Sequence, residues 1–191
     1  MSPFIQAAYL VTQTLFDIYL FALLLRFLFQ VVRADFYNPL SQLVVKVTNP
    51  PLKPLRRLIP GLWGIDWACL MICTILGMLK LSLLFWIQLQ KMPGPLGLFV
   101  WTLGDLTKMT LYLFFFSILI QAVLSWVNPY GNHPLQALLS QITSPFMRPF
   151  RRFIPPIAGF DITPIFAILL IQVMIILIAG PIIQYGTRWA L

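Results

Sequence analysis

The sequence contains no glutamate, five aspartates, two cysteines and one histidine among its 191 residues. Charged residues make up only 9% of the chain, whereas a soluble domain carries about a quarter. Hydrophobic residues reach 60%, and the mean hydropathy is +0.88. This composition excludes an ordinary soluble domain and indicates a protein embedded in a lipid bilayer.

Motifs that would carry enzyme chemistry are also missing. We find no glycine-rich phosphate loop, no nucleophile elbow and no His/Cys cluster with metal-ligand spacing. His133 stands alone in its loop. Cys69 and Cys73 lie four residues apart in a predicted helix, where they suit apolar packing better than a disulfide, redox or metal pair. We therefore expect no enzymatic activity, no cofactor and no metal.

Thirteen lysines and arginines give the chain a net charge of +8. In a soluble protein such an excess would suggest a nucleic acid as the partner. Here most of the positive charge flanks apolar segments, where positive-inside topology and anionic lipid head groups account for it more simply. The expected partners are therefore the lipid bilayer and anionic phospholipid head groups rather than nucleic acid.

Four apolar segments are each long enough to cross a bilayer, which takes about 20 helical residues. The first has no basic region before it and no clear cleavage site, so we interpret it as a retained helix rather than a signal peptide. Arg26 and Arg33, near its end, are expected to extend to the lipid head groups. Asp105 and Lys108 are expected on the first turns of the third segment or just outside it. The predicted spans are residues 4–32, 65–89, 98–127 and 162–183.

A 28-residue segment occurs twice in the chain, at residues 39–66 and again 95 residues later at 134–161. Aligned without a gap, 12 of the 28 positions are identical. The copies include Pro54-Leu-Arg-Arg-Leu-Ile-Pro60 and Pro149-Phe-Arg-Arg-Phe-Ile-Pro155. A repeat spaced by about half the chain length indicates an internal duplication.

Each copy begins as an amphipathic helix that is too short to span a membrane. Asn38-Pro39 is a typical helix start, and apolar residues follow at helical spacing. We predict that Pro50-Pro51 ends the first helix and Pro145 the second, because the residue before a proline avoids helical geometry. One further helical turn is expected between the prolines that flank each arginine pair. The predicted amphipathic hairpins cover residues 38–60 and 133–155.

The predicted fold is therefore an all-α membrane protein with four transmembrane helices in two parallel repeats, residues 1–95 and 96–191. Each repeat consists of a span, an amphipathic re-entrant or interfacial hairpin, and a second span. Two spans per repeat place both hairpins on the same side of the membrane. The hairpin side carries most of the positive charge, so the positive-inside rule makes it cytoplasmic and places both termini outside.

Paired arginines in the hairpins are the first candidate site. One interpretation is an anion site for lipid phosphates or an acidic partner, formed by Arg56, Arg57, Arg151 and Arg152. The alternative is a topological role with internal pairing, in which one arginine of each pair bonds to an aspartate nine residues later. Asp66 and Asp161 are those aspartates, and each is also placed to cap the transmembrane helix that follows.

Asp17 and Lys80 are the second candidate site. Asp17 lies 16 residues before Arg33 and Lys80 lies 14 residues after Asp66, so both should sit at similar depth in antiparallel spans. Ionisable residues inside a membrane often mark ion or proton pathways. The alternative is a neutralised structural pair inside the helix bundle.

The repeated segment resembles the YggT family of small bacterial membrane proteins, whose plastid and cyanobacterial relatives are called YlmG. The resemblance rests on Asp35-Phe-Tyr-Asn-Pro39, on the two Pro-x-Arg-Arg-x-Ile-Pro blocks, and on the Gly-x-Asp that follows each block. It implies a bacterial inner (plasma) membrane protein linked to tolerance of osmotic or other extracytoplasmic stress, with cation uptake as one route. The plastid relatives imply roles in nucleoid distribution, organelle division and assembly of a membrane cytochrome.

Two functions follow from these observations. The first is support of osmotic tolerance through cation uptake, with potassium as the first ion to consider, which should depend on Asp17 and Lys80. The second is a non-transporting scaffold or assembly factor for cell division, nucleoid distribution or membrane-protein maturation. Its arginine hairpins would bind anionic lipid, a membrane-protein partner or a second copy of the chain. The absence of an evident broken-helix binding site weakens the case for a transporter.

Overall fold

The computed structural model describes residues 2–59, 61, 64–127, 133–153 and 161–191, and these residues form helices and short connections without a strand. This confirms the predicted all-α class. Four helices are long and apolar enough to cross a membrane, namely α1, α3, α4 and the continuous α6–η1–α7 helix. The helices are α1 (Pro3–Val31), α2 (Pro39–Leu58), α3 (Trp67–Leu89), α4 (Pro95–Val127), α5 (Pro134–Phe153), α6 (Thr163–Met174), the π-helical η1 (Ile175–Ala179) and α7 (Gly180–Ala190).

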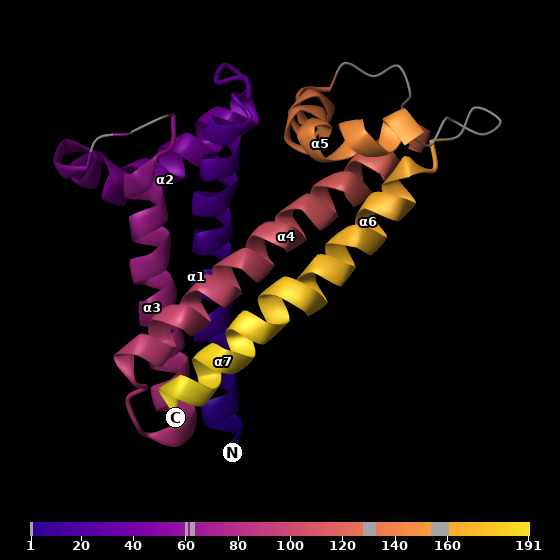
Figure 1. Ribbon diagram of the computed structural model, residues 1–191. Helices are drawn as coiled ribbons and strands as arrows, with labels where there is room; N and C mark the ends of the chain where they lie inside the picture. Colours follow the sequence, from indigo (N-terminus) through magenta and orange to yellow (C-terminus); the bar gives the residue numbers. More distant parts are fainter. Residues whose placement is uncertain (1, 60, 62–63, 128–132, 154–160) are drawn as a thin grey trace.

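The amphipathic helices α2 and α5 both lie at one end of the molecule, which we call the hairpin end (Figure 1). Both chain termini lie at the opposite end, the terminal end, where α3 also turns into α4. The four long helices run between the two ends, and α4 packs along α6 and α7 at an incline to the pair formed by α1 and α3. The chain thus passes twice through the order long helix, amphipathic helix, long helix.

Polar side chains fix the starts of three helices. The Asn38 side chain accepts a hydrogen bond from the Leu40 amide (3.0 Å) at the start of α2. His133 lies 95 residues later and uses its ring Nδ1 in the same way at the start of α5 (3.3 Å). Asp66 caps α3 by accepting from the Cys69 amide (3.1 Å), as the sequence predicted. These side chains satisfy amide groups that the helix itself leaves without a partner.

The predicted helix ends at the prolines are wrong. Helix α2 continues through Pro50, Pro51 and Pro54 as far as Leu58, and α5 likewise continues through its two prolines. An interior proline removes one backbone hydrogen bond and leaves the carbonyl four residues earlier without a donor. In α2 those carbonyls belong to exposed residues, where water or lipid head groups can satisfy them. They are the carbonyls of Lys46, Val47 and Pro50.

The fourth long helix extends to Ala190 rather than ending at Ile183, because its last turns pack tightly against α4. A Cβ atom on Gly186 would lie 2.3 Å from the Trp101 amide nitrogen, so only glycine permits this approach. The Gly94 amide also donates to the Ala190 carbonyl (3.0 Å). Contacts through small residues of this kind are typical of helix pairs in membranes.

The largest buried cluster lies between α1, α3 and α4 and reaches up to α2. Its members include the fully buried Leu20 and Leu23 of α1 and Leu52 of α2. Cys69 and Cys73 are free thiols inside this cluster, as expected for apolar packing residues. This cluster therefore packs α2, the first amphipathic helix, against α1, α3 and α4.

Candidate functional sites

A buried ion cluster joins three of the spans. The Lys80 ammonium of α3 lies 2.6 Å from Asp17 Oδ1 of α1 and 2.7 Å from Asp105 Oδ2 of α4. The Lys80 side chain is 4% exposed, whereas Asp105 is 20% and Asp17 is 35% exposed. The structure thus brings together the two residues paired from the sequence and adds a third.

The third member of this cluster corrects a prediction. Asp105 was expected on the first turns of its span or just outside it, whereas α4 begins at Pro95 and places Asp105 almost three turns inside. Lys80 lies nine residues before the end of α3 at Leu89. Counting residues from the turn between the two helices therefore puts both side chains at matching depth. Placing the helix start at residue 98 instead of Pro95 shortens the count to Asp105 by three residues.

The ion cluster has an excess of negative charge, because one ammonium faces two carboxylates. A lysine this deeply buried is tolerated only when it is paired. The cluster can hold α1, α3 and α4 together through these contacts. Two carboxylates beside one ammonium are also consistent with the hypothesis of an ion pathway.

Each arginine pair at the hairpin end contributes its first arginine to an internal ion pair. Arg56 binds Asp66 through Nε (3.1 Å) and through Nη2, and Arg151 Nη2 lies 3.2 Å from Asp161. The separation is ten residues rather than the predicted nine, because the first arginine of each pair, not the second, bonds to the aspartate. Arg57 and Arg152 are exposed, and neither forms a salt bridge within the described residues. Internal pairing therefore accounts for only half of the conspicuous arginines.

Asp161 lies outside the membrane-spanning segments and holds the start of α6. Its carboxylate accepts hydrogen bonds from the amide (2.9 Å) and the hydroxyl of Thr163. Burial raises the pKa of Asp161, but the hydrogen bonds from Thr163 and the charge and hydrogen bond of Arg151 outweigh this effect, so the net pKa lies below the usual value. The carboxylate is therefore ionised throughout the physiological range.

Arg26 departs from its predicted position among the lipid head groups. It is 6% exposed, and its Nη1 donates to the Thr48 hydroxyl (2.7 Å) and the Val45 carbonyl (3.2 Å) of α2. Removing one acceptor of a buried guanidinium is costly, so these contacts fasten α2 onto α1. The matching position 95 residues later is Gln121, which accepts from the hydroxyl of Thr143. The threonine is the same in the two repeated segments, as Thr48 and Thr143. That identity was the sequence signal that a side chain of the preceding long helix contacts this position in each half.

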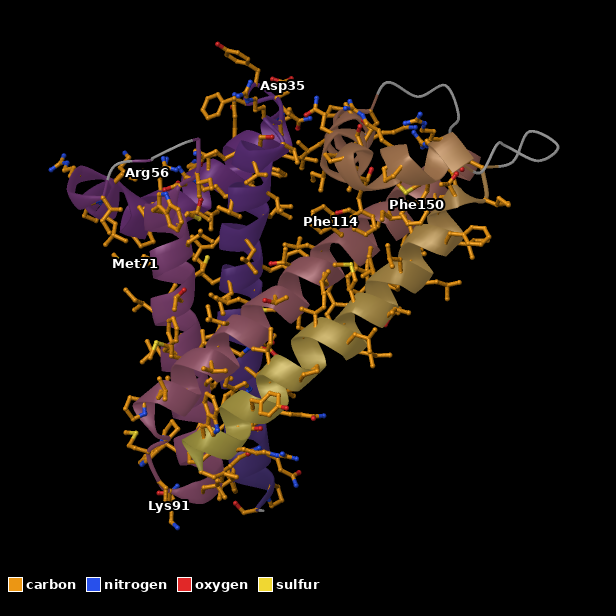
Figure 2. All side chains as sticks on the ribbon, in the orientation of Figure 1. Asp35, Arg56, Met71, Lys91, Phe114 and Phe150 are labelled. Carbon is orange, nitrogen blue, oxygen red and sulfur yellow. The ribbon has the colours of Figure 1, made fainter. Side chains whose placement is uncertain are left out.

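The hairpin end carries most of the exposed positive charge. Arg56 lies at this end, whereas Lys91 lies at the terminal end (Figure 2). Two exposed cations belong to the terminal end, Lys91 and Arg188. Within the described chain, the hairpin-end cations that are exposed and form no salt bridge are Arg33, Lys46, Lys53, Arg57, Arg148 and Arg152.

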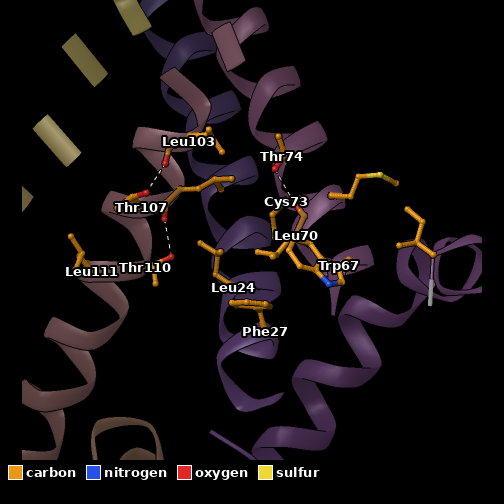
Figure 3. A pocket seen from close by; sticks show the side chains of 13 residues that line it. Leu24, Phe27, Trp67, Leu70, Cys73, Thr74, Leu103, Thr107, Thr110 and Leu111 are labelled. Atoms are coloured by element: carbon orange, nitrogen blue, oxygen red, sulfur yellow. Dashed lines mark hydrogen bonds between the residues drawn. The ribbon is translucent and has the colours of Figure 1, made fainter. Parts of the chain in front are cut away.

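A cavity of about 630 Å³ opens between α1, α3 and α4 (Figure 3). Leucines and aromatic side chains line most of it. The threonines that reach it donate their hydroxyls to carbonyls one turn back in their own helices, as the dashed lines of Figure 3 show. They are Thr74, Thr107 and Thr110, with donor–acceptor distances of 2.9, 2.7 and 2.8 Å. This cavity suits a lipid chain better than a hydrated ion.

Comparison with known proteins identifies the family. The model of the CCB3/YggT family matches the chain twice, over residues 5–87 and residues 100–182. The chain belongs to the CCB3/YggT family. YggT of Escherichia coli is 39% identical over 163 residues, which cover 84% of this chain and 83% of that protein. Protein PA0392 of Pseudomonas aeruginosa is 41% identical over 173 residues, or 90% of this chain and 88% of that protein.

One shorter relative matches about half of the chain. The ycf19 protein of Porphyra purpurea is 32% identical over 92 residues, which cover 47% of this chain and 90% of that protein. No solved structure matches the chain. The two family matches each include one arginine pair and the long helices on either side of it. The chain is thus a multi-pass membrane protein of this family.

Proposed function

We propose that this protein is a non-enzymatic scaffold or assembly factor of the bacterial inner membrane, whose hairpin end binds anionic phospholipid or a membrane-protein partner at the cytoplasmic face. The observation that carries the proposal is the set of exposed, unpaired cations on and beside α2 and α5. Their position also supports a cytoplasmic hairpin end and outward-facing termini by the positive-inside rule.

The amphipathic helices have the surface that such a role needs. Helix α5 buries Leu138 and Ile142 against the bundle, so it presents its other faces outward. Helix α2 exposes Leu43 and Val47 next to Lys46. Apolar side chains beside cations suit the boundary between head groups and acyl chains, where buried apolar area and electrostatic attraction both strengthen binding.

The test is to neutralise the two unpaired arginines in the double variant Arg57→Gln/Arg152→Gln. Each cation near an anionic membrane surface contributes about 1 kcal/mol, so the double variant should bind phosphatidylglycerol about 30-fold more weakly. Native mass spectrometry of the purified protein with mixed phosphatidylglycerol and phosphatidylcholine measures this preference. The matched control is Lys91→Gln/Arg188→Gln at the terminal end, which should leave the preference unchanged. Equal losses in the two double variants would contradict the proposal.

A second candidate is cation uptake in support of osmotic or extracytoplasmic stress tolerance, with potassium as the first ion to test. The excess carboxylate of the ion cluster favours it, because Lys80 neutralises only one of Asp17 and Asp105. Potassium flux into liposomes should then exceed that of empty liposomes and vanish in the variant Asp17→Asn/Lys80→Met. Flux no greater than in empty liposomes would reject autonomous conduction and leave the scaffold role.

A further inference from the structure

A second pocket lies between α1 and α2 at the hairpin end, with both polar and apolar side chains in its walls. Its volume is about 250 Å³, slightly below the range of about 300–1,000 Å³ that is usual for sites of drug-sized ligands. Its polar walls come from Arg26 and Gln30 of α1 and from Ser41 and Arg56 of α2. We propose that this pocket binds a phosphate group, held between the Arg26 and Arg56 guanidinium groups and the Ser41 hydroxyl.

The charge of the pocket calls for an anion. Arg56 is paired with Asp66, whereas Arg26 forms no salt bridge within the described part of the chain. Two guanidinium groups therefore meet one carboxylate, and the one without a salt bridge, Arg26, is the buried one at 6% exposed, whereas the Arg56 side chain is 41% exposed. An unpaired buried charge is strongly unfavourable, and a bound phosphate would compensate it.

Several donors of the pocket have no acceptor within the described residues. Arg26 uses Nη1 on α2, and its Nε and Nη2 have no acceptor among the described residues. Arg56 commits Nε and Nη2 to Asp66 and leaves Nη1. The Ser41 hydroxyl is 3% exposed and has no hydrogen-bond partner in the described structure. Buried hydroxyls are normally satisfied, and guanidinium donors match phosphate oxygens in geometry and charge.

The second half of the chain shows what the pocket looks like without these groups. The positions 95 residues after Arg26 and Ser41 are Gln121 and Gln136. Gln121 and Arg151 line a cavity of about 100 Å³ there, which therefore holds one guanidinium group instead of two. The two halves thus differ at two of the three residues that the proposal requires, Arg26 and Ser41, and share the third, because Arg56 corresponds to Arg151.

The phosphate has two sources with the same chemistry, the head group of an anionic phospholipid and free inorganic phosphate. A lipid can enter from the surface where α2 meets the head groups, and in that case the site rests on the proposed function and gives it one defined lipid position. Inorganic phosphate needs no such assumption. The experiment therefore uses both probes.

The test uses the full chain in phosphatidylcholine nanodiscs with two pocket variants, Arg26→Gln and Ser41→Ala. Calorimetry measures binding of inorganic phosphate, and native mass spectrometry measures retention of phosphatidylglycerol. Arg26→Gln imitates the second half and should weaken binding at least tenfold. Ser41→Ala removes an unpartnered hydroxyl, so it should preserve the fold and weaken binding about fivefold. The control Lys91→Gln removes an exposed cation at the terminal end and should leave the binding of both probes unchanged.

The outcomes separate the sources and the two proposals. Phosphate binding that depends on Arg26 and Ser41 assigns the site to free phosphate, whereas a dependence seen only for phosphatidylglycerol assigns it to the lipid. Wild-type binding of both probes in both pocket variants would overturn the site, as would an equal loss in Lys91→Gln. Because the scaffold test uses Arg57 and Arg152, it can succeed while the pocket fails, and the reverse also holds.

Discussion

The ion cluster makes an asymmetric prediction about charge. Replacing Lys80 by methionine keeps the length of the side chain but leaves two carboxylates, Asp17 and Asp105, within apolar helices without a cation. Breaking a buried ion pair by removing one partner costs about 3–5 kcal/mol. Because the Asp17 side chain is 35% exposed and thus partly screened, we expect the lower part of that range, about 3 kcal/mol.

Removing a carboxylate instead of the ammonium should change the stability only slightly. Asp105→Asn removes the excess negative charge, leaves Lys80 paired with Asp17, and keeps an amide oxygen that can accept a hydrogen bond from the ammonium. We expect the free energy of unfolding to change by less than about 1 kcal/mol. The neutral triple variant Asp17→Asn/Lys80→Met/Asp105→Asn should recover most of the loss, because an uncharged cluster of similar volume is often as stable as a buried ion pair.

Reversible unfolding in mixed detergent micelles, followed by tryptophan fluorescence, measures these differences. Lys91→Met is the matched control, because this lysine is exposed at the terminal end and its loss should have almost no effect. Equal stability of the Lys80→Met and Asp105→Asn variants would refute the reasoning, because the balance of charge would then not govern the cluster. Failure of the triple variant to recover would show that shape, rather than charge, determines its stability.

Three further predictions concern packing, titration and the attachment of α2. Gly186→Ala should destabilise the protein by about 1–3 kcal/mol, because the new methyl group meets the backbone of α4, whereas Gly180→Ala meets its nearest atom at 3.6 Å and should be tolerated in the same thermal assay. Thr163→Val should raise the low pKa of Asp161, which an NMR titration measures. Because the pKa is depressed in the folded state, the ionised carboxylate stabilises the fold at pH values above its unfolded pKa. This contribution to stability is lost as the pH falls through the folded-state pKa. Thr48→Val removes an acceptor of the buried α1 arginine and should cost about 1.5–3 kcal/mol and speed hydrogen exchange in α2, and an unchanged exchange rate would contradict the fastening role of this contact.

The sequence by itself determined the class of the fold and the order of its elements. Long apolar segments can satisfy their backbone in a bilayer only as helices, and local chemistry was sufficient to place the Asn38 and Asp66 caps. Sequence spacing also placed Asp17 and Lys80 at one depth, because helical rise converts residue counts directly into distance along a span. The family resemblance was also confirmed, because it rests on the arginine blocks, which are short motifs at fixed spacing in the sequence.

Tertiary structure alone decided which side chains meet. Local rules end a helix at Pro50, but the packing of α2 on the bundle overrides them. Whether Arg26 reaches the lipid surface or turns inward to Thr48 depends on where α2 lies, and no periodicity contains that information. The same holds for Asp105, which completes the ion cluster, and for Ser41, which lines a pocket together with Arg26. Such contacts join helices distant in the chain, so their geometry depends on the packing of the whole bundle rather than on any one segment.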